Sequence, residues 1–289
     1  MATAPPRARR LDLAVIADAH LGARRSRPEE LLRYLESIDP KRLVICGDLI
    51  DLDAARRGGF REVHLAVVNH LLALAAQGTR VYYLSGNHDA GVRRFGNLAL
   101  GNLHLRDELE LRLDGRSYLL MHGDRLDAAV RFHLGADRVG DWAYRVVSWA
   151  HRVVDRTRWR FGRAPYSLAR ELRRRPDEVA PYLEAFQRVA ARLAATRGCD
   201  AVICGHTQRP EIAEHDVNGT SVTYLNPGDW LHGLTALEYR FGRWRVERYD
   251  ARDRLPPSRR LRVDAQAPDI ASDASTLLAR ILEHGPTRA

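Results

Sequence analysis

Gly86-Asn87-His88-Asp89 closes the apolar run 80–84, and this turn decides how the rest of the sequence is interpreted. A strand that stops in such a turn presents an amide, an imidazole and a carboxylate at one edge of a sheet. Four other apolar runs also stop in small-residue turns that carry Asp or His: Asp18-Ala19-His20, Gly47-Asp48, His122-Gly123-Asp124 and Gly205-His206-Thr207-Gln208. Because the carboxyl ends of parallel strands meet at one edge of a sheet, we expect these side chains to lie close together.

The apolar pattern between these turns alternates between strand and helix. Apolar runs predict strands at 11–17, 42–46, 80–84 and 200–204, and a hairpin of strands at 109–113 and 117–121. Helical spacing predicts helices at 28–38, 61–77, 139–153 and 177–196. Short strands at 221–225, 234–239 and 243–249 are expected to form a second, antiparallel sheet. The pattern therefore predicts an α/β fold with polar turns at the carboxyl ends of its strands.

Composition places the chain among globular proteins with a sizeable core, because 45% of its 289 residues are hydrophobic. No stretch approaches the roughly 18 apolar residues of a membrane span, and residues 1–10 lack the apolar middle of a signal peptide. We therefore expect residence in the cytosol. The cysteines form no CxxC pair, which favours reduced, buried thiols at Cys46, Cys199 and Cys204.

Positive charge is concentrated in one segment of the chain. The formal net charge is +9, and residues 131–175 hold twelve arginines against four acidic residues, a net of +8. Such a segment indicates an anionic partner, which is a phosphorylated substrate, an anionic lipid surface or nucleic acid. No recognised nucleic-acid motif accompanies the arginines, so no specific nucleic acid is expected.

The polar residues at the strand ends have the chemistry of a metal centre. Carboxylate, imidazole and amide oxygen together suit a divalent ion, with manganese the first choice and iron, zinc or magnesium as alternatives. Seven donors are too many for one ion and suit two: Asp18, His20, Asp48, Asn87, His122, His206 and Gln208. A carboxylate shared between two ions would hold their spacing, and Asp48 is the natural candidate.

In this order, the five turns resemble the motifs of the calcineurin-like metallophosphoesterases, with Asp51 completing the second motif. The resemblance covers 11–250 and implies a two-sheet β-sandwich flanked by helices. It also implies one metal held by Asp18, His20 and Asp48, and a second held by Asp48, Asn87, His122 and His206. It pairs His88 with Asp51, so that His88 would stabilise the transition state or protonate the leaving oxygen.

Gln208 departs from the family pattern, which usually has a second histidine on the first metal at this position. An amide oxygen can still coordinate a metal, but it is a poorer ligand for a borderline ion. We therefore expect reduced affinity at the first metal site. If the whole site had decayed, the chain would be a binding module rather than an enzyme.

A narrower resemblance is to the UDP-2,3-diacylglucosamine pyrophosphohydrolase branch of that family. It rests on Arg131-Phe-His133, Gly140-Asp-Trp-Ala-Tyr144, Asp200-Ala-Val-Ile-Cys-Gly-His206 and Tyr224-Leu-Asn-Pro-Gly-Asp-Trp230. The branch implies hydrolysis of a lipid-linked nucleotide sugar at an anionic membrane surface, with a helical insertion that caps the site. Here that insertion would be 131–176, which contains the basic segment and three tryptophans. Arg131, Asn226 and Trp230 would then contact the substrate.

Plainer interpretations stay open beside these. A generic phosphatase or phosphodiesterase would use the arginines to hold soluble phosphoesters, and the apolar stripe at 139–153 would then pack on the core. In that case Trp230 would be a core residue and Asn226 a turn residue. Asp124 and Asp229 are expected to be turn residues or to orient the ligands. We expect a domain at 11–250 between loosely ordered tails at 1–10 and 251–289, acting at the cytoplasmic face of a membrane.

Overall fold

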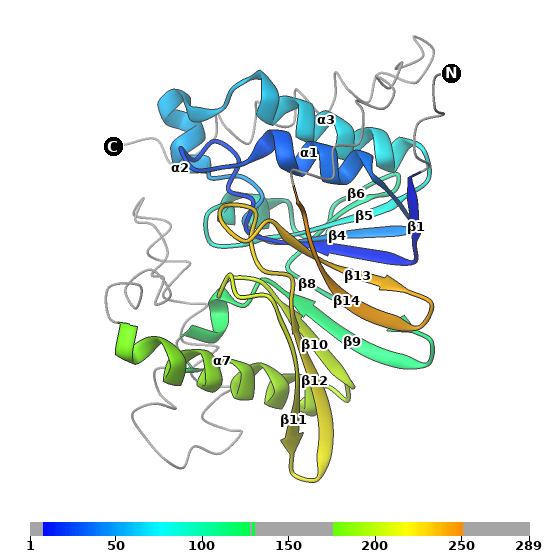
Figure 1. Ribbon diagram of the computed structural model, residues 1–289, viewed down its shortest axis with the longest axis vertical. Helices are drawn as coiled ribbons and strands as arrows, with labels where there is room; N and C mark the ends of the chain where they lie inside the picture. Colours follow the sequence, from blue (N-terminus) through cyan, green and yellow to red (C-terminus); the bar gives the residue numbers. More distant parts are fainter. Residues whose placement is uncertain (1–7, 128, 131–175, 251–289) are drawn as a thin grey trace.

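The computed structural model describes residues 8–127, 129–130 and 176–250 (Figure 1). The basic insertion, the helix expected at 139–153 and Arg131 lie outside the described residues. Within the described ranges the secondary structure is mixed, with β-strands in layers and helices packed outside them.

The larger sheet has seven strands in the order β14-β13-β2-β4-β5-β7-β6. Their bounds are Leu13–Ile16 for β2, Arg42–Cys46 for β4, Arg80–Leu84 for β5, Ala99–Leu100 for β6, Leu103–Arg106 for β7, Thr235–Arg240 for β13 and Arg243–Arg248 for β14. The central strands β2, β4, β5 and β7 run parallel to one another. Their carboxyl ends therefore meet at one edge, as the turns following β2, β4 and β5 led us to expect.

The smaller sheet has five strands in the order β11-β12-β10-β9-β8. Their bounds are Glu108–Leu113 for β8, Arg116–Met121 for β9, Ala201–Cys204 for β10, Glu211–Val217 for β11 and Thr220–Asn226 for β12. The predicted hairpin is confirmed as β8 and β9, which pair antiparallel across Asp114 and Gly115. Both turn residues have positive φ, which is the geometry of a tight hairpin.

The prediction of a second, purely antiparallel sheet is wrong in two respects. First, β12 runs parallel to β10, which in turn runs parallel to β9, so the smaller sheet is mixed. Second, β13 pairs antiparallel with β2, so that β13 and β14 extend the larger sheet. The three predicted strands are present as β12, β13 and β14, but pairing between distant strands leaves no local signal in the sequence.

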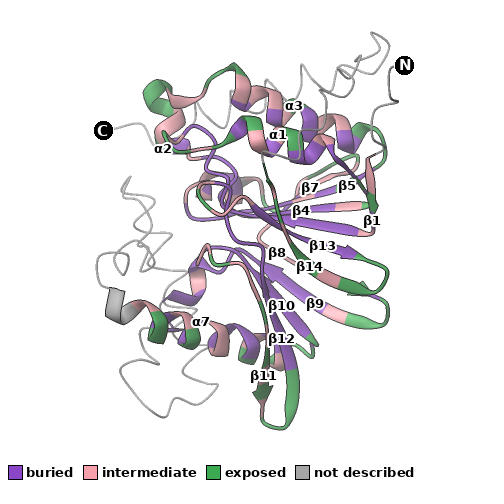
Figure 2. Ribbon diagram, viewed as in Figure 1, coloured by how far each residue is buried: buried purple, intermediate pink, exposed green. Residues whose placement is uncertain are grey.

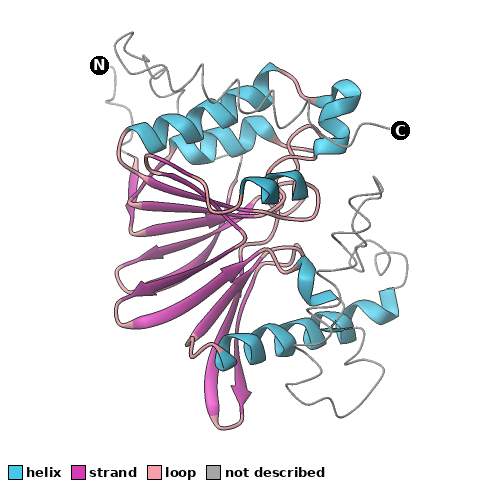
Figure 3. Ribbon diagram, turned by 180° about the vertical axis from the view of Figure 1, so that it is seen from behind, coloured by secondary structure: helices cyan, strands magenta, loops and turns pink. Residues whose placement is uncertain are grey.

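Helices flank the two sheets on their outer faces, as the views from the front and from behind show (Figures 1 and 3). The larger sheet carries α1 (Pro28–Glu36) and α3 (Glu62–Ala76), and the smaller sheet carries α7 (Pro176–Thr196). Shorter elements are β1 (Arg9–Leu11) paired with β3 (Ile38–Pro40), α2 (Leu52–Ala54), η1 (Ala55–Gly59), η2 (Ala90–Phe95) and η3 (Asp124–Leu126). The expected two-sheet sandwich flanked by helices is confirmed.

The strands and the helices beside them are largely buried (Figure 2), and their apolar residues form three core clusters. Val44 and Leu84 of the larger sheet share one buried cluster with Leu120 and Ile203 of the smaller sheet. Side chains on the opposite faces of the strands pack against the flanking helices, as with Phe186 of α7. Strands buried on both faces explain why β4, β5 and β10 appear in the sequence as continuous apolar runs.

The three thiols are free and buried, as predicted. No helix in the described ranges is both long enough and apolar enough to cross a membrane.

Candidate metal centre

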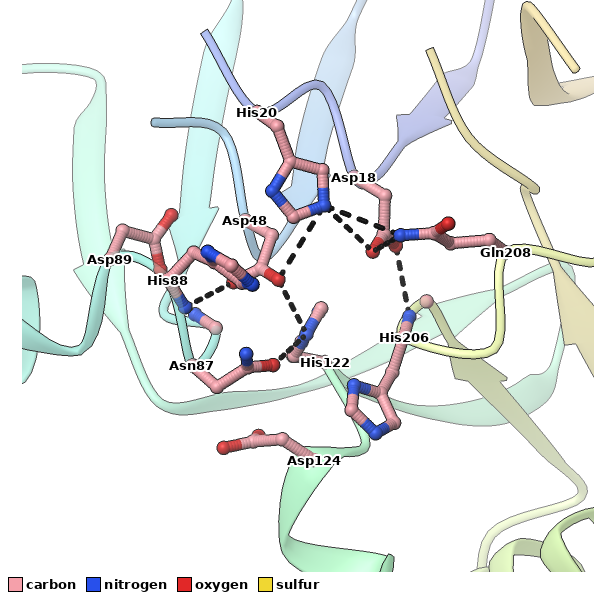
Figure 4. A network of polar contacts seen from close by, with 12 residues as sticks. Asp18, His20, Asp48, Asn87, His88, Asp89, His122, Asp124, His206 and Gln208 are labelled. Carbon is pink, nitrogen blue, oxygen red and sulfur yellow. Dashed lines mark hydrogen bonds and ion pairs between the residues drawn. The ribbon is translucent and has the colours of Figure 1, made fainter. Parts of the chain in front are cut away.

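The polar turns of both sheets meet at one place (Figure 4). Asp18 and His20 follow β2, Asp48 follows β4, and Asn87 follows β5 in the larger sheet. The smaller sheet adds His122 after β9, and His206 and Gln208 after β10. The structure thus brings together all seven residues that the sequence suggested as metal ligands.

Asp48 lies at the middle of this group. Its Oδ2 is 3.8 Å from His20 Nε2 and 3.4 Å from His122 Nε2, so one carboxylate oxygen faces an imidazole on each side. The other oxygen, Oδ1, accepts a hydrogen bond of 2.8 Å from the backbone N–H of His88. This bond fixes the carboxylate, and the remaining oxygen is placed where two ions could share it.

His122 is oriented by the strand beside it. Its Nδ1 lies 2.9 Å from the carbonyl oxygen of Cys46, which can only accept a hydrogen bond. A neutral His122 ring therefore carries its proton on Nδ1, and the lone pair of Nε2 points towards Asp48 and towards Asn87 Oδ1, 3.2 Å away. Gly47 is required here, because a Cβ at that position would lie 2.4 Å from His122 Nδ1.

His206 is held from two sides. Its backbone N–H donates to Asp18 Oδ2 at 2.9 Å, and its ring Nε2 lies 3.1 Å from both carboxylate oxygens of Asp127. Asp127 also accepts a hydrogen bond of 2.7 Å from Tyr182 of α7. With Nε2 engaged in this way, only Nδ1 of His206 is left for a metal.

Sequence reasoning did not identify Asp127 as part of the site. It lies in the segment after β9, behind Asp124 and away from any strand end, so its position relative to His206 depends on tertiary packing alone. An aspartate five residues after a predicted histidine ligand was the single available hint.

Gln208 contacts the first group of donors through its nitrogen. Nε2 donates to Asp18 Oδ1 at 3.0 Å and lies 3.3 Å from His20 Nε2. Rotation of the amide would present Oε1 instead. Gln208 is therefore within reach of any ion that Asp18 and His20 could hold.

Backbone strain is concentrated at these residues. Five of the seven have positive φ: Asp18, His20, Asp48, His206 and Gln208. Non-glycine residues adopt this left-handed region at a cost of order 1–3 kcal/mol each, and such residues cluster at functional sites. The strain is retained because the bonds from Asp18 and Asp48 to neighbouring turns hold these backbones in place.

His88 and Asp51 stand at the rim of the site. His88 Nδ1 is 3.5 Å from Asp51 Oδ2, and the ring meets His20 edge to face at 4.6 Å. Asp51 also accepts a hydrogen bond of 2.8 Å from the backbone N–H of Ala54. Partial burial would raise the pKa of Asp51, but these bonds lower it to about 2, so the carboxylate stays charged beside His88.

The ligand groups are electrostatically coupled. Burial would raise the pKa of Asp48, but His122 and His20 lower it well below the ordinary carboxyl value. Burial would lower the pKa of His122, but Asp48 and Asp18 raise it well above the ordinary imidazole value. Asp127 likewise outweighs burial and raises the pKa of His206. Divalent ions would compete with protons for these lone pairs, because a bound ion supplies the same positive charge.

Other buried carboxylates support the turns. Asp89 is fully buried and accepts hydrogen bonds from Tyr83 Oη and from the backbone N–H groups of Gly86 and Leu49. Asp124 accepts two hydrogen bonds from Arg93, and Asp229 accepts from the N–H groups of residues 231–233. Asp124 and Asp229 are therefore supporting and turn residues, as expected.

Two residues expected to contact substrate are instead buried. Asn226 is completely buried, where it donates to Gly205 O and accepts from Gly228 N, and Trp230 is 1% exposed and packs against Tyr34. We correct that expectation: a side chain enclosed in this way has no surface to offer a substrate. Asn226 holds the β10 and β12 turns together, and Trp230 belongs to the core.

A cavity of about 360 Å³ opens over the metal centre. It is lined by Asp18, His20 and Asp48 of the centre, and also by Arg24, Arg25 and His232. Arg24, Arg25 and His232 could not be predicted as lining residues, because two arginines among 46 basic residues carry no distinguishing signal.

The donor set fits divalent metal ions. Asp18, Asp48 and His122 each offer a ligand atom, and these atoms lie within 4.8 Å of one another; His20, Asp51 and His88 form a second such group. Buried oxygen and nitrogen donors on strained turns, beside an open cavity, are the arrangement of a site that could bind metal ions and a substrate.

The chain belongs to the calcineurin-like phosphoesterase family, whose model matches residues 11–210. It is therefore a hydrolase of phosphoester or diphosphate bonds, and its family implies divalent metal ions at this site.

The similarity to individual proteins is at low sequence identity. A protein from Azotobacter vinelandii named UDP-2,3-diacylglucosamine hydrolase is 29% identical over 229 residues, which cover 75% of this chain and 89% of that protein. One of the same name from Nitrosococcus oceani is 29% identical over 239 residues, covering 77% and 88%. A solved dimetal phosphatase from Danio rerio has a TM-score of 0.40 and 11% identity, covering 82% of this chain and 98% of that one.

Proposed function

We propose that this protein is a two-metal phosphoesterase that hydrolyses a diphosphate or phosphodiester bond of a lipid-linked nucleotide sugar. The two-metal part rests on the position of Asp48 Oδ2, which faces His20 Nε2 on one side and His122 Nε2 on the other. The name shared by the relatives supports the substrate part, since they are called UDP-2,3-diacylglucosamine hydrolases.

The first ion would be held by Asp18, His20 and Asp48, with Gln208 beside them. The second would be held by Asp48, Asn87, His122 and His206. Such ions supply positive charge to the phosphoryl oxygens and an acidified water as the nucleophile. We propose manganese, because a mixture of carboxylate, amide and imidazole ligands suits it.

The remaining steps belong to side chains of this protein. His88 is partly exposed at the cavity, so it is placed to donate a proton to the leaving oxygen. Asp51 holds Nδ1 of that ring and directs Nε2 towards the cavity. Cys46 O and Asp127 fix the rings of His122 and His206, so that little reorganisation is needed during the reaction.

The first experiment tests the metal centre. Asp48→Ala should lose Mn²⁺ binding at both positions and abolish hydrolysis of bis(4-nitrophenyl) phosphate. Asp39→Ala, which removes an exposed carboxylate of β3 that lines neither cavity, should behave as the parent. If Asp48→Ala kept the parent's activity, the shared position of Asp48 would be refuted. A parent protein that bound no divalent ion would be a binding module and not a hydrolase of this kind.

The second experiment tests the substrate. Rates on UDP-2,3-diacylglucosamine and on the same nucleotide sugar without acyl chains should differ in favour of the acylated compound. No preference would refute the lipid part and leave a phosphoesterase of soluble substrates.

We also propose that the protein works at the inner face of the cytoplasmic membrane, supported by the arginines and tryptophans of 131–175. Sedimentation with anionic vesicles but not with zwitterionic ones would support this, and equal recovery with both would contradict it.

A further inference from the structure

A second cavity adjoins the one over the metal centre. It has a volume of about 430 Å³ and shares Arg24, Arg25, Leu231 and His232 with its neighbour. Ser26 and Arg27 complete its lining. Because these four residues line both cavities, the two cavities are adjacent. A molecule bound at the metal centre can therefore extend past these residues into the second cavity.

The second cavity is lined by positive charge. The described residues around it include three arginines and one histidine but no carboxylate. Arg27 is engaged with Glu30 at 3.3 Å, whereas Arg24 and Arg25 are exposed and make no ion pair or hydrogen bond within the described ranges. Two guanidinium groups without acidic partners therefore face the space beside the metal centre.

The loop that carries these arginines is fixed to the metal centre. It leaves directly from His20, whose carbonyl oxygen accepts a hydrogen bond of 2.9 Å from the backbone of Ala23. Ser26 closes the loop with bonds to Ala23 O and to His64 Nε2. The arginines are thus placed at a defined position four and five residues after a predicted metal ligand.

The opposite loop is fixed to the same strand end. The backbone N–H of Trp230 donates to Asp18 O at 3.2 Å, and Asp229 caps the N–H groups of Leu231 and His232. Both walls of the second cavity are therefore built from loops whose bases are bonded to residues of the metal centre.

We propose that Arg24 and Arg25 form a second phosphate subsite, which holds the phosphate next to the one attacked at the metal centre. A guanidinium group offers paired N–H donors that match two phosphate oxygens and keeps its charge at every physiological pH. The subsite selects diphosphate esters over substrates with a single phosphate. This inference rests on the proposed phosphoesterase function and assigns its preference for diphosphates to these two residues.

Kinetics on paired substrates test the subsite. The double variant Arg24→Gln/Arg25→Gln is compared with Arg243→Gln/Arg245→Gln, which removes the same charge from exposed positions on the edge strand β14. We expect kcat/KM on the diphosphate UDP-2,3-diacylglucosamine to fall about 10- to 100-fold in the first variant, and on bis(4-nitrophenyl) phosphate less than about threefold. The β14 variant should match the parent on both.

A binding experiment separates the subsite from catalysis. Isothermal titration in excess Mn²⁺ uses methylenediphosphonate, which cannot be hydrolysed, methylphosphonate and inorganic phosphate. Only the affinity for the diphosphonate should fall in the Arg24/Arg25 variant, again about 10- to 100-fold. Weaker binding of inorganic phosphate alone would show a general anion site and would overturn the assignment.

The outcomes distinguish the two proposals. An equal loss on both substrates, or no loss on the diphosphate, would overturn the subsite while the phosphoesterase function stands. If the parent hydrolysed neither substrate, the proposed function would fail, and the titrations alone would decide the subsite. Thermal unfolding of the variants checks that both remain folded.

Discussion

Replacing Gly86 with alanine would displace the carboxylate at the middle of the metal centre. A Cβ at this position would lie 2.1 Å from Asp48 Oδ1 and 2.5 Å from the Asp48 backbone nitrogen, whereas ordinary contacts begin at 3.4 Å. Asp48 or the β5 turn must therefore move by roughly 1 Å, a misplacement that can cost about 100-fold in rate at an active site. We expect kcat/KM for bis(4-nitrophenyl) phosphate to fall by about this factor, and the free energy of unfolding by about 1–3 kcal/mol.

The matched control is Gly78→Ala. Gly78 has a φ of +105°, and a Cβ added to it would meet no heavy atom within 4 Å, so alanine there strains the backbone without touching the site. This variant should lose about 1 kcal/mol of stability and keep the parent's kcat/KM. Mn²⁺ titration and urea unfolding are measured on both variants. A Gly86→Ala protein with the parent's activity and metal affinity would refute the close approach of β5 to Asp48.

Three further variants probe the groups around the ligands. Gln208→His replaces the amide 3.3 Å from His20 Nε2 with an imidazole and should raise Mn²⁺ affinity about tenfold in a calorimetric titration, whereas an unchanged titration would place residue 208 outside the ligand set. Asp127→Asn weakens the support of His206 and should lower metal affinity about 10- to 100-fold with an unchanged circular dichroism spectrum; unaltered affinity would contradict that role. Burial would raise the pKa of Asp124, but Arg93 lowers it to about 2, below its ordinary value of 3.8, so Asp124 stabilises the fold above pH 3.8 and loses that contribution as the pH falls through about 2. Asp124→Asn should therefore unfold about 2 kcal/mol more easily at pH 7, and the urea midpoints of variant and parent should converge in that acidic range; a difference independent of pH would refute the linkage.

Local patterns predicted the strands and turns well. The bounds of β4 and β5 agree with the sequence because each is an apolar run that ends next to a glycine or serine. The strand β11 was missed because four of its seven residues, Glu211, Glu214, His215 and Asp216, are charged or polar, a composition that resembles a loop. The sheet to which β13 belongs could not be predicted, since that choice depends on contacts with residues more than 200 positions earlier.

The meeting of the seven candidate ligands at one place could be predicted because each follows a strand. Asp127, Arg24 and Arg25 could not, because their contribution depends on which loops the fold brings beside the strand ends. For Asn226 and Trp230 the local motif was misleading. It suggested residues that a substrate could reach, but tertiary packing encloses both side chains. The sequence therefore predicted which side chains meet at the strand ends, and the surroundings that orient them required the structure.

Because β13 pairs antiparallel with β2, this edge of the larger sheet can be completed only late in translation. Every predicted metal ligand has been translated once the ribosome reaches Gln208, yet the edge beside β2 is still missing. The turn that carries Asp18 receives its bond from Trp230 only after about twenty more residues have emerged. A nascent chain of that length holds all the predicted ligands, but the turn that carries Asp18 still lacks the neighbouring strand β13 and the Trp230 bond that fix its position.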